Sequence, residues 1–353
     1  MTDRAITEKM LIQHYREYPM MQIMDIFKFI YQSSHGCEHL ISDLSRATEM
    51  IRREHEAMPR DRISMSASLD GDFCRVDLSV LDTGLSADTL GYLFYMSAKC
   101  ESEGMTKLLH MLDIADELIR DGRLPFSYDE FKEERLKWEA DGYPAVHHSD
   151  RFRESYNPAY RVVAKKFLSY LHLMTKLDVM LKEGPVKLAI EGGSATGKTT
   201  LSRMLQEIYG CTVFHMDDFF LRPEQRTAER FREPGGNVDR ERFLEEILLP
   251  LSEGKGIITY RPFDCSVFDL GEAVTVSPSR LCVIEGAYSM HPELAGYYDL
   301  SVFLDTPLEE RRRRILKRNP TMADRFFNEW MPMEDLYFRE MNVRERCSFV
   351  IEL

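Results

Sequence analysis

Residues 191–200, EGGSATGKTT, have a spacing of glycine, lysine and threonine that suits phosphate binding. The pattern G-x-x-x-x-G-K-[ST], in which successive backbone N–H groups turn inward around a phosphate, is matched by Gly192, Gly197, Lys198 and Thr199. Glycine permits the positive φ angles and close approach that such a loop needs, and the following helix adds its positive end. We expect Lys198 to reach the β- and γ-phosphates and Thr199 to offer its hydroxyl to Mg²⁺. The predicted nucleotide-binding loop comprises Gly192, Gly193, Ser194, Ala195, Thr196, Gly197, Lys198, Thr199 and Thr200.

Two carboxylates follow other short apolar runs, Asp217 in HMDDFF and Glu285 in CVIEG. Asp217 could accept a proton from an acceptor hydroxyl during phosphoryl transfer, or hold Mg²⁺ through water. The alternative is that Asp217 or its neighbour Asp218 caps the next helix. Glu285 could bind Mg²⁺ or a water molecule. The alternative is that a base-binding or lid residue stands at that position.

Arginines are concentrated in the segment DTPLEERRRRILKRNP. Arg311 and Arg314 are three residues apart and share a helical face, and Arg318 follows one turn later. On a mobile lid, their guanidinium groups could neutralise the phosphoryl group during transfer. The alternative is a solvated basic face paired with Glu309 and Glu310.

The elements that must position these residues can be recognised from residue 186 onward. The short apolar runs VKLAIE, CTVFHM, LCVIEG and LSVFLDT alternate with helical stretches, and SFVIEL could form a last strand. This alternation predicts an α/β fold over residues 186–353, a P-loop NTPase parallel sheet flanked by helices. Ligands of such sheets bind beyond the carboxyl ends of the strands, so we expect the glycine-rich loop, Asp217 and Glu285 to converge there. The strand before the loop and the helix after it weigh against a glycine-rich turn that binds nothing.

The preceding residues, 1–183, predict a mainly α-helical domain with a small β-hairpin. The stretch ISMSASLDGDFCRVDLSVL alternates on both sides of Asp70-Gly71, as a hairpin would. A long helix over 159–183 is predicted by apolar residues on one face, and it ends at Gly184-Pro185, the predicted domain boundary. Further helices are predicted at 5–18, 21–33, 38–57, 86–103, 105–120 and 127–140.

Composition excludes several classes of protein. A net charge of −13 argues against a general nucleic-acid-binding face, and no apolar run approaches the roughly 20 residues of a membrane span. The charged N-terminus lacks a signal-peptide core, and the seven scattered cysteines form no C-x-x-C pair. We therefore expect a cytoplasmic protein with reduced thiols and a small-molecule substrate, without nucleic-acid or membrane partners. The oligomeric state is left open, a homo-oligomer included.

Residues 186–353 resemble the uridine kinase family, in the wider group with phosphoribulokinase and pantothenate kinase. The resemblance is carried by EGGSATGKTT, HMDDFF, PGGNVDRERFLEEILLPL, TYRPFD, VIEGAYSM and FLDTPLEERRRRILKR. It implies an ATP- and Mg²⁺-dependent phosphotransferase in which Asp217 is the catalytic base, while Thr199 and Glu285 help to hold Mg²⁺. The lid arginines of the family contact ATP, and here they correspond to Arg311 and Arg314.

The acceptor region departs from that family. Uridine-cytidine kinases carry a P-x-Y-D-F-x-x-H type stretch that holds the pyrimidine, and the matching RPFDCSVFD has Phe263 for tyrosine and Phe268 for histidine. Phenylalanine can stack on a base but cannot hydrogen-bond its edge, so we expect uridine to be a poor acceptor. Asn237 and Asp239 lie where the family binds sugar hydroxyls. The alternative is that one of them caps the helix starting near Arg240.

Two stretches of the first domain are candidates for binding, although in residues 1–183 we recognise no well-characterised family. In HGCEHL, beside Cys37 and Glu38, His35 and His39 are four apart and would form a metal pair on a helix. The alternative places His35 before the helix and His39 at a domain surface. The stretch GYPAVHHSDRFRESYNPAYR suits an anion-binding loop, or alternatively an interdomain contact, through His147, His148, Arg151, Arg153, Tyr156 and Arg161.

The favoured hypothesis is a kinase that phosphorylates a hydroxyl of a small metabolite, a nucleoside or a related sugar or polyol. Its helical domain would shape the acceptor site or bind separately. A competing hypothesis is an ATP-driven switch whose N-terminal helices bind a protein partner, and a third gives residues 1–183 a reaction of their own. Asp217 distinguishes the first two, because a switch needs no base for an external hydroxyl.

Overall fold

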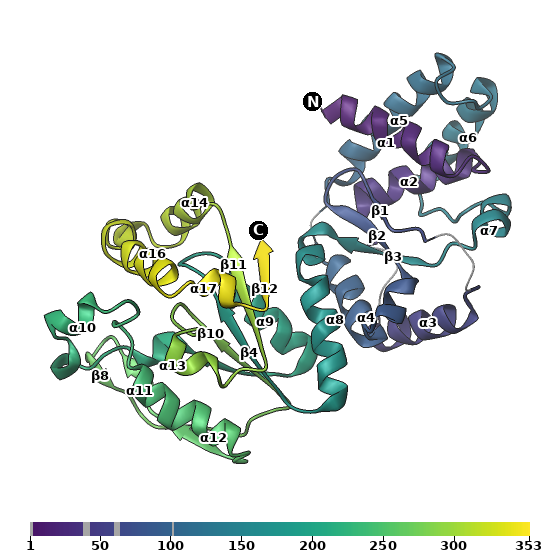
Figure 1. Cartoon of the computed structure of the whole chain (residues 1–353). Helices are drawn as coiled ribbons and strands as arrows, with labels where there is room; N and C mark the ends of the chain where they lie inside the picture. The colour runs from purple at the N-terminus through teal and green to yellow at the C-terminus, as the bar shows by residue number, and fades with distance from the viewer. Residues whose placement is uncertain (1–2, 38–42, 60–63, 101) are drawn as a thin grey trace. The chain divides into compact units, whose positions relative to one another are not determined.

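The chain forms two compact units, Met1–Thr175 and Lys176–Leu353. The computed structural model describes residues 3–37, 43–59, 64–100 and 102–353 (Figure 1). The division between the units falls inside helix α8 (Leu168–Glu183), and the boundary predicted near residue 184 lies at the end of that helix. Within the described ranges, no helix is both long enough and apolar enough to cross a membrane.

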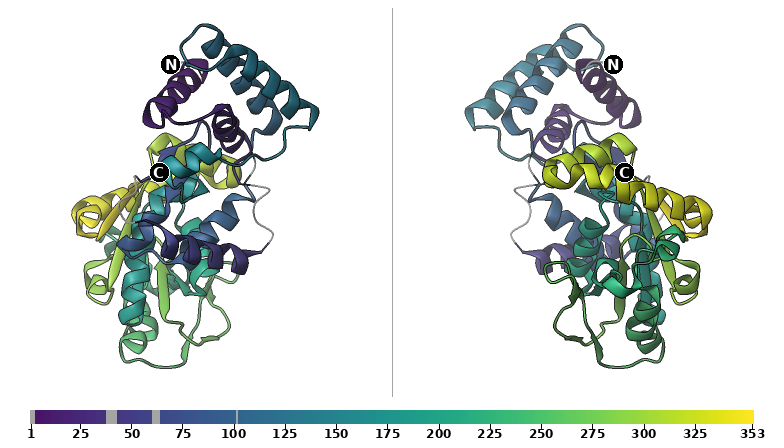
Figure 2. Two further views of the ribbon diagram at one scale, coloured as in Figure 1. Left: turned by 90° about the vertical axis from the view of Figure 1, so that its right-hand side faces the viewer. Right: turned by 90° about the vertical axis from the view of Figure 1, so that its left-hand side faces the viewer.

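The first unit is mainly helical, as predicted. Helix α5 packs against α1, α2 and α6, which lie beside it in Figures 1 and 2. Helix α4 ends at Ser97, earlier than the predicted residue 103, and residues 38–42 of the predicted helix 38–57 lie outside the described residues. The helices of this unit are α1 (Asp3–Glu17), α2 (Ile23–His35), α3 (Leu44–Ala57), α4 (Ala87–Ser97), α5 (Gly104–Arg120), α6 (Tyr128–Ala140) and α7 (Asp150–Tyr156).

A three-stranded antiparallel sheet completes the first unit. The predicted hairpin is confirmed, since β1 (Ala67–Ser68) pairs with β2 (Phe73–Asp77). The prediction of one helix over 159–183 is wrong at its start, because residues 160–164 form β3 (Tyr160–Ala164) opposite β2. Val162 and Val163 are β-branched and buried, so they fit a strand covered on both faces. Apolar spacing alone could not separate this strand from the helix that follows.

The second unit contains the predicted parallel sheet. Its five strands have the order β12-β11-β4-β10-β5, and all neighbours are parallel. Glu285 of β10 lies opposite His215 of β5 and Ile190 of β4, so these three strands end at one edge. The strands are β4 (Val186–Glu191), β5 (Thr212–His215), β10 (Leu281–Glu285), β11 (Leu300–Asp305) and β12 (Phe349–Glu352).

Helices and two small hairpins surround this sheet (Figure 1). Two wide π-helical turns, 244–248 and 326–330, precede Pro250 and Pro332, which cannot donate the usual helical hydrogen bond. The hairpins pair β6 (Ile258–Tyr260) with β9 (Val274–Val276), and β7 (Phe263–Asp264) with β8 (Asp269–Leu270). The helices are α9 (Lys198–Tyr209), α10 (Ala228–Arg232), α11 (Arg240–Phe243), α12 (Leu249–Ser252), α13 (Pro292–Ala295), α14 (Leu308–Arg318), α15 (Ala323–Arg325), α16 (Met331–Glu340) and α17 (Val343–Arg346).

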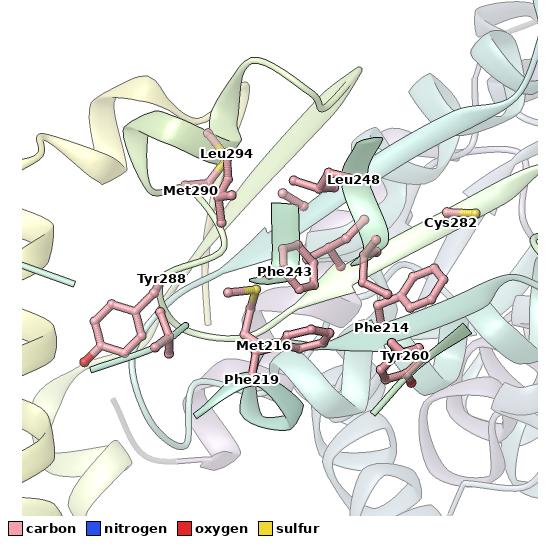
Figure 3. Packing of buried hydrophobic residues seen from close by; sticks show 14 of the residues in the cluster. Phe214, Met216, Phe219, Phe243, Leu248, Tyr260, Cys282, Tyr288, Met290 and Leu294 are labelled. Carbon is pink, nitrogen blue, oxygen red and sulfur yellow. The ribbon is translucent and has the colours of Figure 1, made fainter. Parts of the chain in front are cut away.

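An aromatic core fixes the short turn that follows β5 (Figure 3). Phe219 stacks on Tyr260 at 5.6 Å between ring centroids and meets Phe243 edge-on at 4.9 Å. Met216 is also fully buried, whereas Asp217 between these two anchors is exposed to solvent. Packing of the apolar neighbours therefore turns Asp217 outward from the end of β5.

Candidate active site

The predicted nucleotide-binding loop joins β4 to α9. Gly192 has a φ of 139° and Gly197 a φ of 108°, and a Cβ atom on Gly192 would lie 2.6 Å from the carbonyl oxygen of Leu304. Gly197 is the N-cap of α9 and has no side chain to cap it, so N–H groups of the first turn are left for an anion. Ala195 also adopts a positive φ of 61°, a conformation that costs a non-glycine residue about 1–2 kcal/mol. The loop thus contains local backbone strain at Ala195.

Lys198 lies over the loop that it follows. Its ammonium group donates to the carbonyl oxygens of Gly192 at 2.8 Å and Gly193 at 3.0 Å. The side chain is half-buried and makes these bonds to loop backbone. Because an ammonium group has three N–H donors, one remains for a phosphate oxygen.

Thr199, Glu285 and His215 form a polar group at the strand ends. The Thr199 hydroxyl donates to Glu285 Oε1 at 3.2 Å, and His215 Nδ1 lies 2.7 Å from the same oxygen. Burial alone would raise the pKa of Glu285, but the His215 bond, the Lys198 charge and the Thr199 bond together lower it. The bond to Glu285 in turn raises the pKa of His215.

These oxygens suit Mg²⁺, which usually keeps several waters and takes only one or two protein ligands. The hydroxyl of Thr199 and the carboxylate of Glu285 are such hard ligands. No cluster of three or more His, Cys, Asp or Glu arranged to hold a metal occurs in the described part of the chain. A site of this kind would rely on phosphate oxygens and water for its remaining ligands.

Asp217 lies within range of the same charged groups. Although its side chain is exposed, surrounding protein limits its hydration, and this raises its pKa most; the negative charge of Glu285 raises it further. The positive charges of Lys198, His215 and Arg318 act in the opposite direction. Asp217 therefore lies within electrostatic range of Lys198 and Glu285. We expected this grouping because all three follow the carboxyl ends of parallel strands.

Asp218 points to a different neighbour. Its carboxylate lies 3.5 Å from the hydroxyl of Tyr260, and its backbone carbonyl accepts from Arg242 at 3.1 Å. Limited solvation raises its pKa as well. The two adjacent aspartates thus have separate environments.

Arg311 and Arg314 hold the backbone of the nucleotide-binding loop. Arg311 is buried and donates from Nε to the Ser194 carbonyl at 2.9 Å, while Arg314 donates to the Ala195 carbonyl at 3.1 Å. Arg314 also pairs with Glu310, as the alternative interpretation proposed. Both arginines are therefore bound to the loop here, whereas the exposed Arg318 contributes its charge near Asp217. The contact of the lid arginines with ATP stays a prediction.

Glu334 is a buried residue of this site that sequence reasoning missed. From α16, its carboxylate accepts from the Ser194 N–H at 2.8 Å, the Ser194 hydroxyl at 2.6 Å and Arg311 at 3.0 Å. Both polar groups of Ser194, a predicted phosphate-binding residue, are thus bonded to protein. Arg311 of α14 and Glu334 of α16 thus hold the nucleotide-binding loop through Ser194.

Glu191 is a second missed residue, although it opens the motif EGGSATGKTT. It is fully buried at the end of β4, and burial raises its pKa to about 7. Its carboxylate connects the loop to the segment after β10 and accepts hydrogen bonds from the N–H groups of Gly192, Tyr288 and Met290 and from the hydroxyls of Ser289 and Tyr337.

Of the two predicted sugar contacts, Asp239 has a structural partner for its carboxylate. It is buried, caps α11 by accepting from the Arg242 N–H at 3.2 Å, and also accepts from Gln225 at 2.9 Å. The cap interpretation is therefore what the structure shows for Asp239. Asn237 is half-buried and lies close enough to Tyr288 to affect the pKa of its hydroxyl.

Phe263 and Phe268 form an aromatic pair in the β7–β8 hairpin. Their rings meet edge-on at 5.6 Å, and the guanidinium of Arg226 lies 4.8 Å from the ring centroid of Phe268. Phe263 is buried, whereas Phe268 is 46% exposed. Strand β7 packs against the turn that carries Asp217, so the pair lies near the predicted base.

The predicted metal pair of the first unit cannot be assembled from described residues. His35 lies in the last turn of α2 and stacks on Tyr31 at 4.7 Å, while Glu38 and His39 lie outside the described residues. In the second predicted stretch, Arg151 and Tyr156 contact Met20.

Comparison with known proteins finds kinases among the relatives of this chain, although no family model matches it. A uridine kinase from Anoxybacillus flavithermus is 25% identical over 147 residues, 39% of this chain and 69% of that protein. Pantothenate kinase from Streptomyces avermitilis is also a relative. A segment of this chain is homologous to uridine and pantothenate kinases.

Other known proteins also match only part of this chain. A bifunctional alpha-galactosidase/sucrose kinase from Mediterraneibacter gnavus is 30% identical over 158 residues, 39% of this chain and 17% of that protein. The structure of a possible uridine kinase from Bacillus stearothermophilus covers 51% of this chain and 99% of its own, with 24% identity and a TM-score of 0.38. The relatives are small-molecule kinases, and their similarity extends over about two fifths of this chain.

Proposed function

We propose that the second unit is an ATP- and Mg²⁺-dependent kinase that phosphorylates a hydroxyl of a small metabolite, a nucleoside or a related sugar or polyol. The observation that carries this proposal is the grouping of Lys198, Thr199, Glu285 and Asp217 at one edge of a parallel sheet. The homology to small-molecule kinases supports it.

Asp217 is the proposed general base. Its carboxylate would take the proton of the acceptor hydroxyl as the new O–P bond forms and ADP departs. Its raised pKa brings its basicity closer to neutral pH, where a general base is most effective.

The nucleotide-binding loop is proposed to stabilise the phosphoryl group. Lys198 and the N–H groups at the start of α9 would face the charge on its oxygens, and Arg318 lies near enough to Asp217 to assist. Thr199 and Glu285 would hold Mg²⁺, with Asp217 reaching it through water. When bound, this ion supplies positive charge to the β- and γ-phosphate oxygens.

The acceptor is proposed to differ from uridine. Phe263 and Phe268 offer ring faces but no group that reads a base edge, and Arg226 adds a cation beside them. The related kinases are named for acceptors as different as uridine, pantothenate and sucrose. We assign Asn237 to contact with an acceptor hydroxyl, and Asp239 to positioning of that segment through the cap of α11.

An acceptor panel tests this function. ADP formation from ATP and Mg²⁺ is measured with nucleosides, sugars, polyols and pantothenate, using Lys198→Ala as the inactive control. The proposal expects ADP formation that depends on at least one acceptor. ATP turnover that no acceptor accelerates would contradict it.

A further inference from the structure

The first unit contains a cavity that the kinase proposal does not use. It has a volume of about 600 Å³ and is formed by α2, α3, the stretch 147–159 and β3. Its lining includes the apolar side chains of Met50, Met58 and Phe94. The cationic and polar side chains of the lining, here called the polar wall, include Lys28, Arg153 and Arg161. Ligand sites of small molecules have volumes of about 300–1,000 Å³ and this combination of lining residues.

Two of the cations on the polar wall have no carboxylate partner. Lys28 donates to the carbonyl oxygen of Val146 at 3.1 Å, and burial together with the charges of Arg75 and Arg153 lowers its pKa to about 8. In the described part of the chain, neither Lys28 nor the exposed Arg153 has an ion pair. Arg161 does pair with Glu54, at 2.8 Å, and Glu54 is the single carboxylate among the described lining residues.

A further cation, Arg75, lies behind the polar wall. It is 2% exposed, donates from Nε to Gln32 at 2.9 Å, and its guanidinium lies 4.7 Å from the ring centroid of Tyr160. Gln32 and Tyr160 both line the cavity. The Nη2 atom of Arg75 has no hydrogen-bond partner, and no carboxylate of the described residues pairs with this guanidinium. A buried cation of this kind favours an anion nearby.

An internal anion close to the polar wall, Asp25, is already bound on several sides. It accepts from the backbone N–H and hydroxyl of Ser149 and lies 2.8 Å from His148 Nδ1. Burial lowers the pKa of His148 to about 4, so this imidazole is neutral at pH 7. With its Nδ1–H donated to Asp25, its Nε2 accepts from the Tyr160 hydroxyl at 2.6 Å. These hydrogen bonds fix the wall, and Asp25 acts on Lys28 through its charge without forming an ion pair with it.

We infer that this cavity binds a phosphorylated small metabolite, with its phosphate between Lys28 and Arg153 and its body against Met50, Met58 and Phe94. A phosphate monoester carries nearly two charges and several acceptor oxygens, which match two unpaired cations better than a single carboxylate does. The sequence left two interpretations of the stretch 147–161, an anion-binding loop and an interdomain contact. With this inference, we favour the anion-binding loop.

The test uses the intact chain with Lys198→Ala, so that phosphate binding by the nucleotide loop is weakened. Calorimetric titrations compare inorganic phosphate, ribose 5-phosphate and glucose 6-phosphate with ribose, glucose and succinate. We expect phosphate-containing probes to bind with one site per chain. Lys28→Met and Arg153→Ala should each weaken that binding by about tenfold or more, because each removes a charged hydrogen-bond donor. Lys132→Met on the exposed face of α6 is the matched control and should change nothing.

Three results would overturn the inference. They are the absence of binding by every phosphate-containing probe, binding that survives both cavity substitutions, and equal binding of succinate or the unphosphorylated sugars. Thermal unfolding of each variant shows whether the fold is kept. If Lys28→Met lowers the melting temperature, the variants Lys28→Gln and Arg153→Gln are used instead of Lys28→Met and Arg153→Ala. Their phosphate binding is judged by the same three results.

Discussion

Replacement of Glu334 by alanine tests how the nucleotide-binding loop is held. The carboxylate is 4% exposed and accepts three hydrogen bonds of 2.6, 2.8 and 3.0 Å from Ser194 and Arg311. Its removal leaves the guanidinium of Arg311, itself 8% exposed, without a counter-charge. Breaking a buried ion pair on one side costs about 3–5 kcal/mol. We therefore expect Glu334→Ala to lower the free energy of unfolding of the second unit by that amount.

Tryptophan fluorescence can follow this unit separately. The chain has two tryptophans, Trp138 in the first unit and Trp330 in the second, so a Trp138→Phe background leaves Trp330 as the reporter. Urea titration gives the loss of stability, and ATP titration gives the loss of affinity. We expect about a tenfold weaker affinity for ATP, equivalent to about 1.4 kcal/mol, because Ser194 no longer fixes the loop.

A matched substitution shows whether burial is the cause. Glu340 lies on the same helix and pairs with Arg339 in solvent, so Glu340→Ala should change stability by less than about 1 kcal/mol. If Glu334→Ala were as stable as Glu340→Ala and bound ATP normally, the role assigned to Arg311 and Glu334 in holding the loop would be refuted.

Three further predictions concern the loop, the metal site and the acceptor. Lys198→Ala should abolish ATP turnover while circular dichroism shows an intact fold, and near-normal turnover would exclude the proposed kinase site. His215 has a raised pKa because it pairs with Glu285, and in the proposed site its charged form would compete with Mg²⁺ for that carboxylate. The Mg²⁺ concentration for half-maximal activity should therefore fall as pH rises from about 5 to 8, and His215→Asn should remove much of this dependence; an identical pH profile in the variant would contradict the competition. Phe263→Tyr combined with Phe268→His should raise kcat/KM for uridine by about tenfold or more, since both polar groups are restored. An unchanged preference in acceptor competition assays would show that the aromatic pair does not read the acceptor.

The nucleotide loop and the strand ends could be predicted because their signals are local. Gly192 to Thr199 lie in one strand–loop–helix unit, and each neighbouring strand ends at a polar residue that the parallel order brings to the same edge. Asp217 and Glu285 could therefore be grouped before any contact was known.

Long-range contacts explain what the sequence did not reveal. Glu334 bonds Ser194 across 140 residues, and nothing in the pattern of its helix singles out this carboxylate from its neighbours. The two valines of β3 suit a helix face as well as a strand, and only pairing with β2 decides between them. The cavity around Lys28 likewise joins segments separated by more than a hundred residues.

The most direct test of the central claim is phosphoryl transfer by Asp217→Asn. ATP affinity and acceptor-dependent ADP formation are measured on the same preparations, across the pH range of the wild-type activity. Because Asp217 has a raised pKa and acts only when ionised, wild-type transfer should fall toward acid at a higher pH than an ordinary aspartate would give. The variant should bind ATP as tightly as the wild type but transfer phosphate at least about 10²-fold more slowly. Asp217→Asn that retains transfer at the wild-type rate would contradict the proposal that Asp217 is the base of a metabolite kinase.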